Sequence, residues 1–429
     1  MQRYEKYKDS GVVWIGEIPE HWECKRLGAL LTVFSSKNHT DKPLLSITRE
    51  KGVILRDLDD ETENHNFIPD DLSGYKLIKE GQFGMNKMKA WQGSYGISDY
   101  DGIVSPAYFI FNVAEEIYPK FFHRAIRSKF YVAHFGSASD GVRIGQWDLS
   151  KPRMREIPFF IPPISEQQTI ATFLDDKTAK IDQTIANKQK EIELLKERRQ
   201  ILIQKAVTKG LDDTVKLKDS GVEWIGEIPE HWEVRKLKYV SNVVLGKMIC
   251  NEDRGNYHLK PYLKSKNIQW LKLNLDSVDE MWFSEKEMSQ YKLAKGDIVV
   301  SEGGEVGKAT LWNNELPECY IQNSAHKVTL NSSNNNTYHL FCFFLLGKLG
   351  VFESIVNKVS IGHLTREKLT NINFPHPTLE EQTQIVSHLE EIKEKIAKAI
   401  LLKQQEIEKL KEYKTVLIDN VVTGKVRVS

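Results

Sequence analysis

The sequence has little cysteine, no long apolar run and no excess of either charge, and each absence excludes a class of protein. Its four cysteines lie far apart and form no Cys-x-x-Cys pair, so neither a disulfide framework nor a zinc cluster is expected. No apolar run reaches the roughly 18 residues that suggest a membrane helix, and the first residues lack a signal-peptide pattern, so we expect a cytoplasmic protein without membrane contact. The 60 Lys and Arg residues balance 59 Asp and Glu residues, so any nucleic-acid surface has to be local.

Motifs of catalysis and cofactor binding are also missing. The segment 303–309 superficially resembles a phosphate-binding loop, but Glu302 stands where the first glycine is needed and Ala309 where Ser or Thr is needed. There is no His-Glu-x-x-His motif, no dinucleotide-binding glycine pattern after a strand, and no Asn/Asp-Pro-Pro-aromatic motif. The histidines are scattered singly along the chain. We therefore expect no catalytic residue, metal site or cofactor in this chain.

What the sequence does contain is a long internal repeat. Residues 8–23 and 218–233 agree at 15 of 16 positions. A second repeat relates residues 166–208 to 381–423, with 19 of 43 positions identical. The 429 residues are therefore two tandem units, which agrees with the two or three domains expected for this length.

The second repeat has the pattern of a long helix. Its apolar positions alternate in steps of four and three residues, which is the heptad spacing of a coiled coil. At 1.5 Å per residue each copy would span about 65 Å, and the two copies are expected to pack on each other. The apolar seam consists of Leu174, Ile181, Ile185, Ile192, Leu195 and Leu202 in the first copy and of Leu389, Ile396, Ile400, Ile407, Leu410 and Leu417 in the second.

Between the repeats lie two stretches that share only a thin skeleton. Gly81 and Asn86 correspond to Gly296 and Ser301, Ser105 to Ser324, and Ile144-Gly145 to Ile361-Gly362. Apolar runs alternate with turn residues and short helical patches, which predicts mixed α/β modules. A duplicated scaffold with divergent inserts indicates two recognition modules, although duplication followed by drift without function is the alternative. The expected organisation is a mixed α+β chain with modules over residues 1–163 and 211–377 and long helices over 164–210 and 378–429.

Local charge differs from the overall balance. Residues 120–155 hold eight basic and two acidic residues, and residues 254–272 hold five basic residues and no acidic one. Aromatic residues are interleaved with both stretches, which is typical of surfaces that meet nucleic-acid phosphates. An ordinary solvated basic face is the alternative for either stretch.

Two turn-rich segments at matching places could read base edges. Asn86–Tyr95 and Ser301–Glu305 both follow the shared glycine turn, yet they differ in chemistry. Lys and Gln side chains can form hydrogen bonds with guanine or adenine. The carboxylate of Glu302 can only accept a hydrogen bond, which suits the amino group of cytosine. The two modules are therefore expected to read different bases.

These features together resemble the specificity subunit of type I restriction-modification systems. The resemblance rests on the Asp-Ser-Gly-x-x-Trp-Ile-Gly-x-Ile-Pro-x-His-Trp start of each unit and the Pro…Glu-Gln-x-x-Ile…Leu start of each long helix, and it covers essentially the whole chain. It implies two target recognition domains, each reading one half of a bipartite double-stranded DNA site. It also implies that the helices form an antiparallel coiled coil, with a pseudo-two-fold repeat, that sets the spacer between the half-sites.

The same resemblance implies partners and a role without catalysis. Two methyltransferase subunits would bind along the helices and methylate adenine N6 from S-adenosylmethionine, and two restriction or motor subunits would use ATP and magnesium for phage defence. We expect the DNA-facing residues to be Lys87, Lys89, Trp91, Ser94, Tyr95, Ser105, Tyr108, Arg124, Arg127, Lys129, Arg143 and Gln146 in the first module, and Lys260, Lys264, Lys266, Ser301, Glu302, Lys308, Ser324, His326, Lys358, Ser360 and His363 in the second.

Two other functional classes remain as alternatives. A nuclease built on Asp297 and Glu302 lacks the Asp-x-n-Glu-x-Lys spacing, and DNA hydrolysis by the isolated chain with magnesium would test it. A coiled-coil adaptor for two protein ligands would leave both basic stretches unexplained. A salt-dependent mobility shift with duplex DNA distinguishes the adaptor from a DNA-reading protein.

Overall fold

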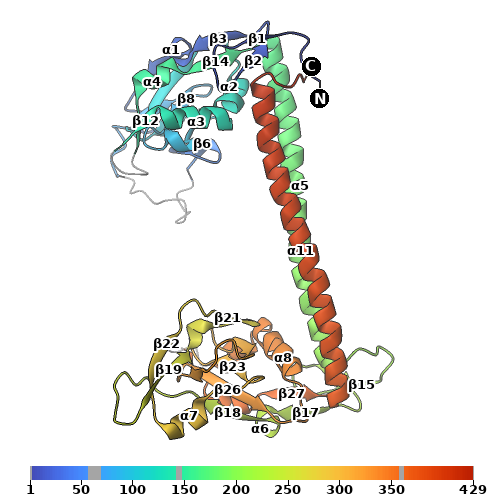
Figure 1. The fold of residues 1–429 in the computed structure, drawn as a ribbon. Coiled ribbons are helices and arrows are strands. Elements are labelled where there is room, and N and C mark those ends of the chain that lie inside the picture. The colour runs from blue at the N-terminus through green and yellow to red at the C-terminus, as the bar shows by residue number, and fades with distance from the viewer. Residues whose placement is uncertain (1, 57–68, 142–146, 357–361, 429) are drawn as a thin grey trace. The chain divides into compact units, whose positions relative to one another are not determined.

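The chain folds into two compact units that each combine one module with parts of both long helices. A computed structural model describes residues 2–56, 69–141, 147–356 and 362–428. Unit 1 comprises Met1–Gln189 and Gln404–Ser429, and unit 2 comprises Lys190–Lys403. Both units mix helices and strands, so the expected α+β class is confirmed (Figure 1). Within the described residues, no helix combines the length and the apolar character needed to cross a bilayer.

Unit 1 is organised around a four-stranded antiparallel sheet with the order β4-β11-β8-β9. Its core is aromatic, and Phe83, Phe122 and Phe135 are fully buried between the sheet and the module helices. The elements are β1 (Tyr7–Asp9), β2 (Glu17–Pro19), β3 (Glu23–Arg26), α1 (Leu27–Leu30), β4 (Leu31–Phe34), β5 (Leu45–Thr48), β6 (Gly52–Leu55), β7 (Lys76–Ile78), β8 (Phe83–Met85), η1 (Ala90–Gln92), β9 (Tyr95–Ile97), β10 (Gly102–Val104), β11 (Phe109–Val113), α2 (Pro119–Ile126), α3 (Lys129–Ser137), β12 (Ser139–Asp140), β13 (Asp148–Leu149), α4 (Lys151–Glu156) and β14 (Pro158–Ile161).

Unit 2 repeats this plan with its own four-stranded sheet, ordered β18-β26-β23-β24. Helix α8 is buried nearly all round and is N-capped by Asn335, whose side chain accepts from the N–H groups of Thr337 and Tyr338. The elements are β15 (Leu217–Asp219), β16 (Glu227–Pro229), β17 (Glu233–Lys236), α6 (Leu237–Val240), β18 (Ser241–Leu245), β19 (His258–Leu263), η2 (Ser265–Asn267), β20 (Ile268–Gln269), β21 (Lys272–Leu273), β22 (Asp279–Phe283), α7 (Glu285–Tyr291), β23 (Ile298–Ser301), β24 (Ala309–Leu311), β25 (Tyr320–Ile321), β26 (Ala325–Leu330), α8 (Asn336–Lys348), α9 (Val351–Ile355), α10 (Arg366–Thr370) and β27 (Asn373–His376).

The register of the two sheets shows which residues correspond. Phe83 faces Ile97 on β9 and Phe111 on β11, whereas Ile298 faces Leu311 on β24 and Val328 on β26. The turns before β8 and β23 contain Gly81 and Gly296, with φ of 81° and 93°, a conformation that glycine adopts without strain. The sparse skeleton seen in the sequence is thus a set of turn and strand positions shared by two copies of one fold.

The long helices α5 (Ile164–Lys209) and α11 (Leu379–Val422) run antiparallel to each other in each unit (Figure 1). In unit 1 Leu174 and Ile181 share a core with Leu417 and Val421, and in unit 2 Val207 shares a core with Ile385 and Leu389. All twelve apolar seam residues predicted from the heptad pattern lie at buried or half-buried positions. This arrangement agrees with an antiparallel coiled coil.

Candidate nucleic-acid interface

The nearly identical segment at the start of each unit has a structural role. The Glu166 carboxylate at the start of α5 contacts the ring nitrogens of His21 (2.7 Å) and Trp22 (3.2 Å). In unit 2 Glu381, at the start of α11, contacts those of His231 (2.8 Å) and Trp232 (3.0 Å) in the same way. The repeated His-Trp pair therefore fixes each module to the first turn of a long helix.

The same segments also reach the end of the other long helix. The Trp22 ring packs near Gly424, just after α11, and the Trp232 ring packs near Gly210, just after α5. Burial acts to raise the pKa of Glu381, but hydrogen bonds from His231, Trp232 and Thr378 outweigh it and hold the pKa at about 2. The carboxylate is therefore ionised at neutral pH and holds its partners as a charged acceptor.

In unit 1 the loop between β8 and β9 lies against the segment that follows residue 146. The rings of Trp91 and Trp147 are 5.1 Å apart, and the Lys87 ammonium is 3.0 Å from the Asp148 carboxylate. Lys89, on the same loop, is exposed, while Trp91 is half-buried. Trp147 belongs to this surface although the sequence prediction omitted it; its position directly after Gln146 was the available signal.

Other predicted residues of unit 1 have internal roles or fall outside the description. Ser94 and Tyr95 are buried beside the core, so they are core residues and not surface residues. Ser105 and Tyr108 are half-buried on the turn before β11. Arg143 and Gln146 lie outside the described residues.

Some residues of the basic stretch of unit 1 have internal partners. The Arg124 guanidinium contacts the Asp175 carboxylate on α5 at 2.7 and 3.0 Å. The guanidinium of Arg127 donates to four backbone carbonyl groups, the shortest being that of Tyr95 at 2.6 Å. Lys129 is exposed. Arg124 and Arg127 therefore hold the module together, so two of the eight basic residues counted in this stretch have internal partners.

Three lysines of the basic stretch of unit 2 lie beside carboxylates. Lys260 pairs with Glu318 at 2.7 Å, Lys264 pairs with Asp279, and Lys266 lies 3.8 Å from that carboxylate. The hydrogen bond from Lys260, together with one from Tyr320, lowers the pKa of Glu318 to about 2. Because these carboxylates come from other parts of the chain, counting charges along residues 254–272 could not reveal them.

The loop between β23 and β24 brings Glu302 and His363 together. The Nδ1 atom of His363 lies 2.9 and 3.1 Å from the two carboxylate oxygens of Glu302. The backbone of Glu302 is held on both sides, because its N–H donates to the Ser324 carbonyl and its carbonyl accepts from Leu364. The Glu302 side chain is 13% exposed and that of His363 is 55% exposed. The imidazole, and not the carboxylate, is the group presented to solvent.

The remaining predicted residues of unit 2 lie around this pair or beneath it. Lys308 donates to the side chain of Gln269 at 2.9 Å, and Ser324 is half-buried with its hydroxyl on Gln322. Ser301 is buried and its hydroxyl donates to the Gly303 carbonyl. His326 is fully buried on the carbonyl of Leu364, so it is a core residue and not a surface residue. Lys358 and Ser360 lie outside the described residues.

The two loop surfaces occupy equivalent places but differ in chemistry. In unit 1 the β8–β9 loop meets residues 147–149, and in unit 2 the β23–β24 loop meets residues 363–364. Both contacted segments follow the Ile-Gly pair that the modules share in sequence. Unit 1 presents Lys89 and the half-buried Trp91, whereas unit 2 presents His363 held by Glu302. Such a pair of surfaces can recognise two different ligands or two different parts of one ligand.

This fold defines a class of protein in which a module of mixed helices and strands is duplicated and both copies are attached to a pair of antiparallel helices. The chain belongs to the family of the type I restriction modification DNA specificity domain, whose model matches residues 120–194 and 229–412. The resemblance to type I specificity subunits inferred from the sequence is thereby confirmed.

Individual relatives agree with this assignment. The MjaVIII specificity subunit of Methanocaldococcus jannaschii, a type I restriction enzyme subunit, is 26% identical over 434 residues, covering 96% of this chain and 94% of that protein. The fold is similar to the HsdS subunit of Thermoanaerobacter tengcongensis, with a TM-score of 0.59 and 18% identity over 95% of this chain and 98% of that one. It is also similar to a solved chain of a type I R-M system, with a TM-score of 0.70 and 17% identity over 95% and 99% of the two chains.

Proposed function

We propose that this chain reads an asymmetric, bipartite site on double-stranded DNA, with one half-site for each unit. The observation that carries the proposal is the contrast between equivalent loops, because the Lys87–Asp148 ion pair in unit 1 occupies the place that the Glu302–His363 pair occupies in unit 2. One fold with two chemistries suits two half-sites of different sequence.

In unit 2 the group that meets a base is His363, and Glu302 is its positioning residue. The Nδ1–H group of a neutral His363 ring donates to the Glu302 carboxylate, which leaves Nε2 as an acceptor on the exposed edge. In the major groove, the amino groups of adenine and cytosine are the donors that such an acceptor recognises. This replaces the simpler expectation that Glu302 itself accepts from cytosine.

The long helices are proposed to bind two copies of one methyltransferase subunit, which supplies S-adenosylmethionine and the transfer to adenine N6. Two copies of one partner need two equivalent surfaces, and on a duplicated chain these consist of exposed residues identical in both repeats. Such residues are Glu193, Lys196 and Glu197 in unit 2, which match Glu408, Lys411 and Glu412 in unit 1.

A reciprocal pair of ion pairs at the helix centre supports this symmetric arrangement. Lys188 contacts Glu406 at 2.5 Å in unit 1, and Lys403 contacts Glu191 at 2.6 Å in unit 2. Lys188 corresponds to Lys403 and Glu191 to Glu406 in the repeat, so each ion pair is the counterpart of the other.

The helices are proposed to act as a ruler that sets the DNA spacer.

The chain is proposed to work without catalysis of its own, in the cytoplasm. Methyl transfer belongs to the methyltransferase subunits, and two restriction or motor subunits with ATP and magnesium complete the nuclease. All four cysteines are free thiols, in keeping with a reducing compartment. Methyl transfer by the purified chain without a partner would contradict this part of the proposal.

An exchange of modules tests the central proposal. Replacing residues 24–150 by the same region of a relative should change the half-site read by unit 1 and leave the other half-site and the spacer unaltered. The reconstituted methyltransferase complex is assayed by sequencing methylated adenines in a random DNA library. A simultaneous change of both half-sites would show that the modules do not read independently.

A second experiment tests the docking surfaces. Glu197→Lys and Glu412→Lys should each reduce the complex from two methyltransferase copies to one, and the double variant should bind none, as measured by native mass spectrometry. Lys190→Glu is the matched control, because this exposed position differs between the repeats. Full assembly of the double variant would place the docking surface elsewhere.

The adaptor alternative gains some support from the basic residues that are paired internally. Arg124, Lys260 and Lys264 all have carboxylate partners, so they add little free positive charge. A mobility shift with duplex DNA at several salt concentrations decides between an adaptor and a DNA-reading protein, because an adaptor for proteins shows no salt-dependent DNA binding.

A further inference from the structure

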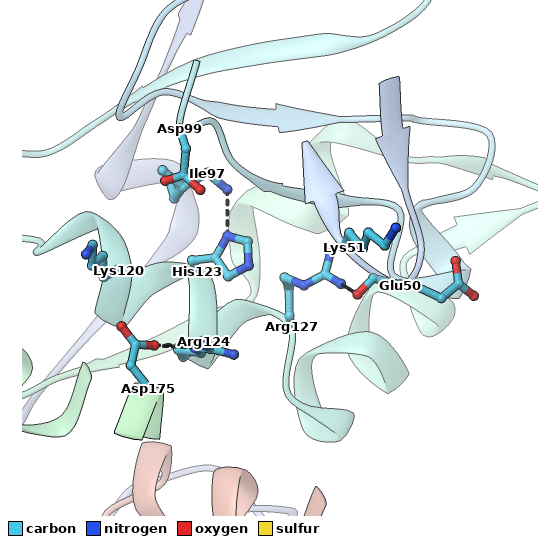
Figure 2. A pocket seen from close by; sticks show the side chains of 9 residues that line it. All are labelled: Glu50, Lys51, Ile97, Asp99, Lys120, His123, Arg124, Arg127 and Asp175. Atoms are coloured by element: carbon cyan, nitrogen blue, oxygen red, sulfur yellow. Dashed lines mark hydrogen bonds and ion pairs between the residues drawn. The ribbon is translucent and has the colours of Figure 1, made fainter. Parts of the chain in front are cut away.

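Each unit contains a cleft at the same place in the duplicated fold. The basic cleft of unit 1 has a volume of about 570 Å³. The cleft of unit 2 has a volume of about 410 Å³, and its lining mixes leucines and Phe341 with neutral polar residues, two lysines and two glutamates. The cleft of unit 1 lies between β9, α2 and the beginning of α5. The cleft of unit 2 lies between the corresponding elements β24, α8 and the beginning of α11. The basic cleft is lined by Glu50, Lys51, Ile97, Asp99, Lys120, His123, Arg124, Arg127 and Asp175 (Figure 2).

The correspondence of the two clefts can be traced residue by residue. The backbone N–H groups of Tyr118 and Asn335 both donate to the glutamine that begins the long helix, which aligns α2 with α8. Sheet register aligns β9 with β24, and the repeat aligns α5 with α11. Lys120, His123 and Arg124 then correspond to Thr337, Leu340 and Phe341, while Ile97, Asp99 and Asp175 correspond to Leu311, Asn313 and Glu390.

The duplication has therefore kept the cleft but not its chemistry. The three α2 positions that line the basic cleft carry nitrogen-containing side chains, whereas the matching α8 positions carry a hydroxyl, an aliphatic group and an aromatic ring. A segment shared by two identical partner subunits could not fit both linings.

The charges of the basic cleft leave one positive charge in excess. Four cationic side chains, those of Lys51, Lys120, Arg124 and Arg127, face three carboxylates. Arg124 and Asp175 neutralise each other in a direct ion pair. Glu50 and Asp99 are exposed, and Glu50 lies 4.0 Å from Arg49, outside the cleft. Lys51 and Lys120 form no ion pair within the described residues.

The excess charge is that of Arg127. Its guanidinium donates only to carbonyl groups, and no described carboxylate lies within ion-pair distance of it. Burial lowers the pKa of this guanidinium, which means that its environment disfavours an unbalanced cation. A bound anion would supply the missing charge.

His123 provides a fixed neutral donor in the same cleft. Its Nδ1 accepts the N–H of Ile97 at 3.2 Å, so the ring proton resides on Nε2, at the opposite edge of the ring (Figure 2). Burial lowers the pKa of His123 to about 4, so the ring is neutral at pH 7. The Nε2–H group can therefore donate to an acceptor oxygen without adding charge.

We propose that the basic cleft of unit 1 binds a phosphate group, held by Lys51, Lys120 and the Nε2–H group of His123 beside the charge of Arg127. The cleft of unit 2, in which two lysines are balanced by two glutamates, does not bind one. The phosphate can belong to the DNA backbone or to a free phosphate compound, and both present the same tetrahedral anion. The site stands apart from the proposed function, because inorganic phosphate would bind it whether or not the chain reads DNA.

The first arm of the test uses inorganic phosphate and the full chain. Isothermal titration calorimetry at pH 7 should detect saturable binding, and Lys51→Ala with Lys120→Ala should weaken it by at least about tenfold, since the variant lacks two charge-assisted hydrogen bonds. Both lysines are exposed, so the variant should fold normally, which circular dichroism checks. Lys272→Ala, which changes an exposed lysine of the unit 2 cleft, is the matched control and should change nothing.

The second arm uses duplex DNA of random sequence. If the ligand is a backbone phosphate, the double variant should reduce the slope of log affinity against log salt by about 0.9 for each phosphate that the protein no longer neutralises. Weakened phosphate binding with an unchanged slope assigns the site to a free phosphate compound. The proposal is overturned if the double variant changes neither measurement, or if Lys272→Ala has an equal effect.

Discussion

Replacing His363 by alanine should abolish a preference for one base pair in the half-site read by unit 2. The imidazole is 55% exposed, whereas the Glu302 carboxylate that holds it is 13% exposed. Loss of one hydrogen bond to a base amino group costs about 0.5–1.5 kcal/mol, which corresponds to a roughly two- to tenfold loss of preference. Phosphate contacts are untouched, so the salt dependence of affinity should stay the same.

Glu302→Ala should have nearly the same effect through a different cause. Without the carboxylate, the ring has no acceptor oxygens at 2.9 and 3.1 Å and no longer presents Nε2 in one direction. The double variant with His363→Ala should therefore lose no more than either single variant, which makes the two changes strongly non-additive. Glu302→Gln should restore most of the preference, because the amide oxygen can still accept from Nδ1–H.

The assay is methylation of a library randomised in one half-site, by the complex reconstituted with its methyltransferase. Glu305→Ala is the control, because Glu305 is an exposed residue of the same loop that pairs with Lys308. The preference of unit 1 serves as an internal reference in every variant. If Glu302→Ala altered the preference while His363→Ala did not, the carboxylate itself would be the reading group, and the reasoning from exposure would be refuted.

Three further predictions concern the helices and the contacts at their ends. Glu381→Gln should speed hydrogen exchange at the start of α11 at pH 7. In the wild type, the stabilisation by the Glu381 carboxylate is complete above the ordinary carboxyl pKa of 4.5 and is lost as the pH falls towards about 2. Hydrogen exchange in the variant should lack this pH dependence. Lys188→Glu should destabilise unit 1 by about 0.5–1 kcal/mol in thermal unfolding, and adding Glu406→Lys should restore the stability. If the second substitution did not restore the stability, the ion pair would not contribute to it. Four residues inserted between Ala206 and Asp213 add about 6 Å if helical, so the preferred spacer should grow by one to two base pairs at roughly 3.4 Å each, with some activity lost through rotation. A library that varies only the spacer measures this, and an unchanged optimum would contradict the ruler.

The sequence by itself determined the architecture of this protein. The heptad spacing is a local pattern, and the 15-of-16 repeat is found by comparing the sequence with itself. Together they predicted two units, two long helices and the apolar seam of these helices. The matching glycines at 81 and 296 and the serine at 301 marked the loops that the structure places at equivalent positions. Such features follow from short-range geometry, which a pattern along the chain records directly.

Only the tertiary structure decided which side chains are available to a ligand. Lys260 and Lys264 looked free because Glu318 and Asp279 lie outside the basic stretch, and His326 looked accessible because nothing nearby in sequence reveals that it is fully buried. The pairing of Glu302 with His363 joins residues 61 positions apart. Charge pairing and burial depend on contacts between distant segments, and these contacts exist only once the chain has folded.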